Sequence, residues 1–385
     1  MTIPKADTAA AKPVEVPQTE TDILVLQGGG ALGAYQAGAY QALTDAGRDI
    51  RWIAGISIGA INAAIICGNP EKLRAAKLAD FWDTVSVGLT TPAWADATWS
   101  RDIFTRMASA TAIMTGVPGF FRPRFPWAGV SAAGVLNGTS YYDTAPLRDT
   151  LTRLIDFDYL NEHGPRLSVG AVDIETGNFA YFDSRRTRIT PEHVMASGAL
   201  PPGFPAVEID GRHYWDGGLV SNTPLQYVLE NAGHDPICVF QVDLFSARGA
   251  NPDLLDDVAQ REKDIRFSSR TRLTTDRFRQ LNHIQEAAKR LAAKLPEEFR
   301  EDPDLAHLMS SGPPCPVTLL HLIHRKEFFE GVSKDYEFSR LSMQQHWNAG
   351  ARDVRRSLDH ELWRNRKIAA DGLQVFDLSR RLAAT

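Results

Sequence analysis

The chain has 385 residues, which is enough for one large domain with an extension or for two modest domains. Its apolar content of 43% and charged content of 23% are those of a globular protein with a sizeable core. A net charge of −5 argues against a nucleic-acid partner, since nucleic-acid-binding domains usually carry a basic excess. The three cysteines have no metal-ligand spacing and favour a reducing, cytoplasmic location.

The N-terminal 20 residues (1–20) are rich in Ala, Pro, Thr and Lys and lack the apolar core of a signal peptide. We therefore predict a disordered tail. The longest apolar run, Ile53–Cys67, is interrupted by Ser57 and Asn62 and is shorter than the roughly 20 residues that span a bilayer. No membrane-spanning segment is predicted, and peripheral contact with a lipid surface stays open.

The first predicted elements alternate between strand and helix. Asp22–Gln27 is a short apolar run, typical of a buried parallel strand, and it ends in three glycines. Ala31–Ala46 has a helical pattern, Ile50–Ile56 is a second strand that leads into Ser57, and Gly59–Cys67 is a second helix. This order predicts an α/β fold with a central, mainly parallel sheet flanked by helices.

The pattern continues beyond an irregular region and changes character near residue 245. Further strands are predicted at Leu167–Ile174, Phe179–Phe182, Ile237–Leu244 and Val317–Ile323. A helix followed by a proline-rich loop is predicted at Pro191–Pro205. Asp264–Leu295 is a charged, amphipathic stretch, and Leu341–Arg364 is a helical region with Gly350 as an interruption. We predict a catalytic domain at 21–245 and a mostly helical extension at 246–385 that adds an edge strand.

The first motif that carries chemistry is the glycine-rich loop Gly28–Gly33, between a strand and a helix. Glycine lets backbone N–H groups point at an anion, and the helix N-terminus favours negative charge. The loop also fits a dinucleotide-binding turn, but that interpretation expects an acidic residue after the second strand. A purely structural tight turn is the other alternative.

The second strand instead ends in Gly55-Ile56-Ser57-Ile58-Gly59, a G-x-S-x-G elbow. In such an elbow, the serine is exposed on a sharp strand-to-helix turn and acts as a nucleophile. A nucleophilic serine needs a base within hydrogen-bond reach.

Asp216-Gly217-Gly218, after the strand-like Arg212–Trp215, offers that base, because a carboxylate in a dry site has a raised pKa. A Ser–His–Asp triad using His321 or His324 is the alternative. It is disfavoured because an α/β-hydrolase places several strands before the elbow, whereas here only one strand precedes the strand that leads into Ser57.

The chain resembles the patatin-like phospholipase family in four ordered segments. They are Gly28–Gly38, Gly55–Asn62, Ala196–Pro205 and Tyr214–Leu225. The resemblance implies a Ser57–Asp216 dyad without histidine. It also implies an oxyanion hole from backbone amides, for which we predict the donors Gly28, Gly29, Gly30 and Ile58. Gly33, Gly55, Gly59, Gly217 and Gly218 are predicted to support these motifs.

The sequence departs from the family pattern at Leu32, where many members carry Arg or Lys, so the glycine loop must be anchored differently. The predicted function is hydrolysis of lipid esters, with acyl transfer on the same dyad, or a non-catalytic lipid-surface role, as alternatives. No cofactor and no metal are expected. The aromatic and basic loop Phe120–Trp127 is either packed on its own domain or a contact for lipid.

Overall fold

The structure is a computed structural model that describes residues 20–86, 98–124, 138–269, 271–299, 301–310, 315–325, 330–368 and 372–378. Residues 1–19 of the predicted tail and residues 125–127 of the predicted aromatic loop lie outside these ranges.

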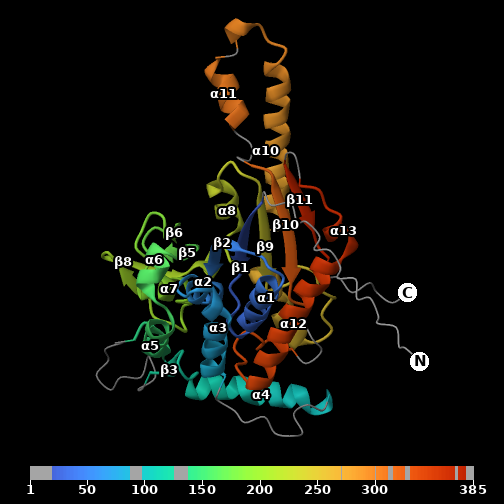
Figure 1. Cartoon of the computed structure of the whole chain (residues 1–385). Coiled ribbons are helices and arrows are strands. Elements are labelled where there is room, and N and C mark those ends of the chain that lie inside the picture. The colour runs from blue at the N-terminus through green and yellow to red at the C-terminus, as the bar shows by residue number, and fades with distance from the viewer. Residues whose placement is uncertain are drawn as a thin grey trace, which may run out of the picture.

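A nine-stranded sheet forms the centre of the molecule (Figure 1). Its order is β11-β10-β9-β1-β2-β5-β8-β7, with β6 paired to β5. The strands are β1 (Thr21–Leu26), β2 (Ile50–Ile56), β5 (Arg166–Asp173), β6 (Phe179–Asp183), β7 (Val207–Ile209), β8 (Arg212–Asp216), β9 (Ile237–Asp243), β10 (Val317–Ile323) and β11 (Leu373–Phe376). The strands from β11 to β5 are parallel, whereas β6, β7 and β8 pair antiparallel. The predicted mainly parallel α/β sheet is confirmed.

Helices cover both faces of this sheet (Figure 1). They are α1 (Ala34–Asp45), α2 (Ile58–Cys67), α3 (Glu71–Val85), α4 (Thr98–Thr115), α5 (Ala145–Leu154), α6 (Phe157–Glu162), α7 (Pro191–Ser197), α8 (Leu225–Asn231), α9 (Leu255–Phe267), α10 (Thr271–Ala292), α11 (Pro303–Ser310), α12 (Arg340–Asp359) and α13 (Glu361–Arg364). Short 3-10 turns lie at Gly30–Gly33, Gly217–Leu219 and Glu297–Phe299, and β3 (Arg122–Pro123) pairs with β4 (Tyr142–Asp143).

The alternation of side chains along β1 explains the layers. Leu24 and Leu26 pack into the larger core with residues of α1, α2 and α3, whereas Ile23 and Val25 pack into a second core with residues of α8 and α10. Both faces of the strand are therefore apolar and buried, as in other parallel sheets. Each such side chain contributes about 1.5–3 kcal/mol by leaving water.

The C-terminal part of the chain is joined closely to this core. Helix α12 packs on α1 at two glycines: a Cβ at Gly38 would lie 1.9 Å from the Trp347 carbonyl oxygen, and one at Gly350 would lie 2.0 Å from the Tyr35 carbonyl oxygen. Gly350 does not interrupt α12, contrary to prediction; its missing side chain instead leaves room for the backbone of α1. Strands β10 and β11 occupy one edge of the sheet. The division of the chain at residue 245 stays a prediction.

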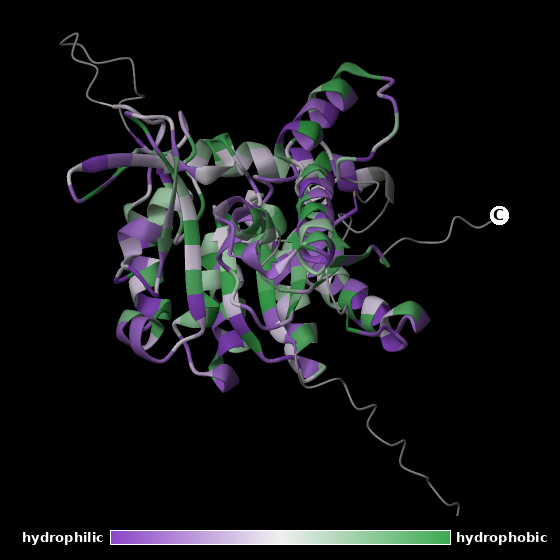
Figure 2. Ribbon diagram, turned by 90° about the horizontal axis from the view of Figure 1, so that it is seen from above, coloured by the Kyte–Doolittle hydropathy of each residue, from purple (hydrophilic) through white to green (hydrophobic). Residues whose placement is uncertain are grey.

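Seen from above, hydrophobic residues concentrate on the central strands, and hydrophilic residues are frequent on the outer helices (Figure 2). Helices α10 and α11 project from the body (Figure 1). In the described ranges, no helix combines the length and the apolar character that are needed to cross a bilayer.

Candidate active site

Ser57 lies on a sharp turn between β2 and α2. Its φ of 55° and ψ of −125° are unusual for a residue with a Cβ, a strain of about 1–3 kcal/mol that the surrounding structure must hold. The flanking glycines allow the turn: a Cβ at Gly55 would lie 2.4 Å from the carbonyl carbon of Gly59, and a Cβ at Gly59 would lie 2.4 Å from the Leu26 carbonyl oxygen. The geometry is that of the predicted elbow.

Ser197 holds the elbow in place. The Ser57 N–H donates to Ser197 Oγ at 3.0 Å, and the Ser197 hydroxyl donates to the Gly170 carbonyl at 2.6 Å. Ser197 is fully buried at the end of α7, inside the segment Ala196–Pro205. The sequence marked this segment as a family motif but did not predict its contact with the elbow.

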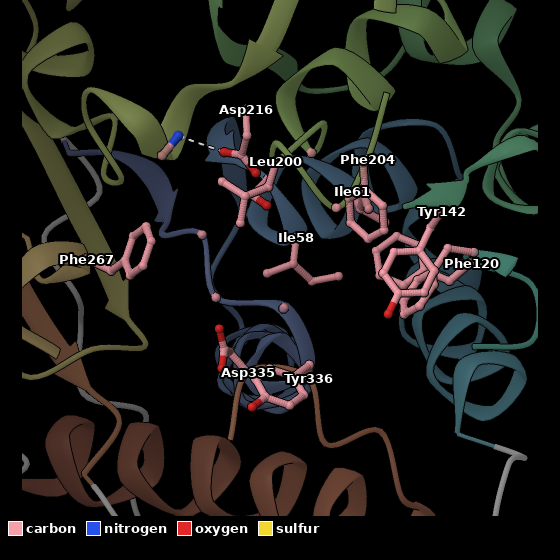
Figure 3. Close-up of a pocket in the computed structure, with 18 of the residues that line it drawn as sticks. Ile58, Ile61, Phe120, Tyr142, Leu200, Phe204, Asp216, Phe267, Asp335 and Tyr336 are labelled. Atoms are coloured by element: carbon pink, nitrogen blue, oxygen red, sulfur yellow. Dashed lines mark hydrogen bonds between the residues drawn. The ribbon is translucent and has the colours of Figure 1, made fainter. Parts of the chain in front are cut away.

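Asp216 ends β8 and is 2% exposed. Burial raises the pKa of this carboxyl to about 7, although hydrogen bonds from the Ser57 side chain and the Gly218 N–H act in the opposite direction. The Gly218 N–H donates to Asp216 Oδ1 at 2.7 Å, the bond drawn in Figure 3. The structure thus places Ser57 and Asp216, about 160 residues apart in the chain, in the lining of the same cavity.

Backbone amides of the glycine loop lie beside this pair. In the described part of the chain, the N–H groups of Gly29, Gly30 and Ile58 form no hydrogen bond. The N–H of Gly28 instead donates to the Asn222 carbonyl at 3.1 Å. The prediction of Gly28 as a donor is therefore wrong, because its N–H already has a partner.

Asn222 braces the glycine loop. Its Nδ2 donates to the Gly28 carbonyl at 3.0 Å and to the Phe267 carbonyl at 2.9 Å. A Cβ at Gly28 would lie 2.3 Å from Asn222 Oδ1, so the contact requires glycine.

The remaining motif glycines allow close packing. A Cβ at Gly33 would lie 2.6 Å from Ile58 Cγ1, and a Cβ at Gly217 would lie 2.7 Å from the Gly170 carbonyl oxygen. Gly33 thus brings the glycine loop against the elbow, and Gly217 brings the turn after Asp216 against β5.

Ser57 and Asp216 open into a cavity of about 350 Å³ that is lined mainly by apolar side chains (Figure 3). On one side lie Ile61, Phe120, Tyr142 and Phe204, and Asp335 and Tyr336 lie opposite Asp216. In the described ranges, no histidine lines this cavity.

Phe120 and Phe121, at the start of the aromatic loop, pack on their own domain. Phe120 and Phe121 are each 7% exposed, and their ring centroids lie 5.8 and 5.1 Å from that of Phe204. For Phe120 and Phe121, the prediction that exposed rings contact lipid is wrong, because both rings are buried and form part of the cavity wall.

His321 and His324 lie away from the cavity. His321 contacts Asp243, and His324 contacts Glu330. The histidine triad is therefore not formed.

A family model described as "Patatin-like phospholipase" matches residues 24–229, more than half of the chain. The chain belongs to the patatin-like phospholipase family. As a member of that family it is a lipid ester hydrolase. A second model, described as "Patatin phospholipase", matches residues 265–369 in the C-terminal part.

Two solved structures have a more distant similarity. VipD from Legionella pneumophila is 13% identical with a TM-score of 0.34, and the match covers 86% of this chain and 67% of that one. A chain in the ExoU–SpcU complex from Pseudomonas aeruginosa is 16% identical with a TM-score of 0.27, covering 66% of this chain and 51% of that one. TM-scores below 0.5 carry no argument about function. Among curated proteins, no match was found.

This patatin-like chain anchors its glycine loop from the C-terminal part. Leu32, which stands where many family members carry Arg or Lys, is fully buried. The loop is instead held by the Ala31 N–H, which donates to the Asp335 carbonyl at 2.8 Å. Gly30 has a φ of +54°, and a Cβ there would lie 2.0 Å from the same carbonyl oxygen. Lys263 Nζ donates to Asp335 Oδ1 at 2.7 Å. No motif in the sequence pointed to Lys263 or Asp335.

Proposed function

We propose that this patatin-like protein hydrolyses lipid esters with a Ser57–Asp216 dyad through an acyl-enzyme. The observation that carries the proposal is that both side chains line one mainly apolar cavity, in which Asp216 is 2% exposed. Burial raises the pKa of Asp216 to about 7, which matches a general base that works near neutral pH.

In the first half of the reaction, Ser57 Oγ attacks the ester carbonyl carbon while Asp216 accepts the hydroxyl proton. The carbonyl oxygen becomes an oxyanion, which the N–H groups of Gly29, Gly30 and Ile58 stabilise. Each such donor is worth about 3–4 kcal/mol in acyl-transfer enzymes. Because Ser57 precedes α2, the helix dipole also favours negative charge at this point.

The tetrahedral intermediate then collapses to the acyl-enzyme. The bond to the alcohol oxygen breaks, and Asp216 returns its proton to that oxygen. In the second half, Asp216 takes a proton from water, the water oxygen attacks the acyl carbonyl, and Ser57 leaves with the proton. The carboxylate is thus regenerated at the end of each cycle.

The cavity favours a substrate with an apolar acyl chain. The wall formed by Ile61, Phe120 and Phe204 offers hydrophobic contact next to the nucleophile. Each buried methylene of an acyl chain contributes about 0.8 kcal/mol to binding. Phospholipids, lysophospholipids, glycerolipids and storage polyesters all present such an acyl ester.

Labelling with a fluorophosphonate probe tests the proposal. We expect the parent chain to gain one covalent adduct on Ser57, and Ser57→Ala to gain none. Ser221→Ala, an exposed serine in the loop after Asp216, is the matched control and keeps the label. A lipid panel with the same variants then measures ester cleavage. An unlabelled Ser57 in a folded, lipid-cleaving parent protein would refute the nucleophile assignment.

A further inference from the structure

A second group of ionisable side chains lies outside the cavity and has no part in the reaction above. His324 follows β10, His346 lies in α12, and Glu330 begins the segment between them. The three side chains are 2%, 2% and 4% exposed, respectively. Their potential ligand atoms all lie within 4.8 Å of one another.

The contacts within the group converge on one carboxylate. His324 Nε2 lies 2.9 Å from Glu330 Oε1 and 3.2 Å from Oε2, and His346 Nε2 lies 3.0 Å from Oε1. Both imidazole Nε2 atoms thus contact the same carboxylate oxygen, Oε1.

We propose that His324, Glu330 and His346 bind one divalent transition metal ion, with zinc as the best match. Two imidazole nitrogens and one carboxylate oxygen are ligands that zinc prefers, whereas calcium and magnesium take mainly oxygen. A buried carboxylate costs free energy unless a positive charge compensates it, and a divalent ion supplies that charge.

The contacts between the carboxylate and the two imidazoles are close to the spacing of zinc ligands. Zinc binds nitrogen at about 2.0–2.1 Å and carboxylate oxygen at about 2.0–2.2 Å, so neighbouring ligand atoms in a tetrahedron lie about 3.3–3.5 Å apart. The contacts of 2.9–3.2 Å must therefore open by a few tenths of an ångström. Each imidazole binds through Nε2 and carries its proton on Nδ1. His346 Nδ1 has no hydrogen-bond partner among the described residues, so it is free to carry this proton.

The role of this ion is structural. It joins β10, α12 and the start of the segment 330–338. That segment carries Asp335, whose carbonyl accepts the Ala31 N–H, and Tyr336 and Phe338, which line the cavity. The metal therefore holds the cavity wall that rests on the glycine loop, without contacting the reacting atoms.

Metal binding by the full chain, without an affinity tag, tests the proposal. The protein is stripped with a chelator and then titrated with Zn²⁺ or Co²⁺. We expect about one zinc per chain by elemental analysis, a Tm raised by several degrees, and the visible absorption of Co²⁺ in a tetrahedral site.

Glu330→Gln and His346→Gln keep side-chain size and hydrogen-bonding groups but remove a ligand. We expect zinc affinity to fall by at least about a hundredfold, as for lost metal ligands or their supports. His163→Gln, a surface histidine, is the matched control and keeps full binding.

A parent chain that takes up no zinc and gains no Tm overturns the proposal, as does Glu330→Gln with parental affinity. If both ligand variants fail to fold, the Co²⁺ spectrum of the parent decides: octahedral absorption only, or none, refutes the site. Fluorophosphonate labelling of Ser57 is measured separately, so the two proposals fail independently.

Discussion

The cavity has two walls that come from different parts of the chain. Ser57 and the glycine loop follow strands β2 and β1, and Asp216 ends β8, all before residue 220. The opposite wall carries Asp335 and Tyr336 from the C-terminal part (Figure 3). The first wall consists of strand-to-helix or strand-to-turn motifs, whereas the second lies in an irregular segment before α12.

The two walls therefore have different roles in the proposed reaction: one carries the reacting groups, and the other positions them. In the proposed reaction, the first wall supplies the groups that touch the ester, and short-range backbone geometry determines their form. The second wall touches the glycine loop through the Asp335 carbonyl and is itself held by Lys263. Changes in the first wall should therefore abolish turnover, and changes in the second should weaken it by displacing the loop.

The largest expected effect is at the base. Asp216→Asn cannot accept the Ser57 proton, so kcat/KM for a soluble ester should fall by about 10²–10⁴-fold. Asp173→Asn is the matched control and keeps near-parental turnover, because Asp173 caps a turn through the N–H groups of Glu175 and Thr176 and pairs with Arg212, without lining the cavity. Circular dichroism checks that both variants fold. Near-normal turnover of Asp216→Asn would disprove its role as base.

The pH dependence of kcat/KM in the parent protein also tests the role of Asp216 as the base. The pKa of Asp216 is raised to about 7, and only the deprotonated carboxylate accepts a proton. As the pH falls below about 7, kcat/KM should therefore decrease by about tenfold per pH unit, and above it the rate should reach a plateau. Steady-state kinetics between about pH 5 and about pH 9 measure this. A flat profile down to pH 5 is the contrary outcome.

A smaller effect is expected in the second wall. Lys263→Met removes the ion pair with Asp335, and a loop displaced by a fraction of an ångström should lower kcat about tenfold with little change in KM. Lys263→Arg should recover part of the rate, and Lys289→Met, which removes a surface ion pair, should have no effect. If Lys263→Arg and Lys263→Met lose the same amount of kcat, or if only KM changes, Lys263 does not act by positioning the glycine loop.

The smallest effect should come from the apolar wall. Phe204→Ala removes a ring that packs on Phe120 and Phe121, so KM for long-chain esters should rise by several-fold. A short-chain ester should be cleaved at nearly the parental rate, because it does not reach this wall. Phe299→Ala, at an exposed site remote from the cavity, serves as the control. Equal losses for long and short esters would argue against an acyl site here.

The sequence by itself determined the local parts of the site. The elbow around Ser57 and the base-bearing turn at Asp216 were predicted from glycine spacing and from the strand before each, because a turn depends on residues a few positions apart. The mainly parallel sheet followed from the alternation of strand and helix along the chain.

Only the tertiary structure decided which groups meet. The partner of the Gly28 N–H, the support of the elbow by Ser197 and the clamp of Asp335 on Ala31 join segments far apart in the chain. The same holds for His324, Glu330 and His346, whose separations of six and 16 residues form no metal-ligand pattern. Such contacts depend on how helices and strands pack across the sheet, and packing is a property of the whole chain rather than of any short segment.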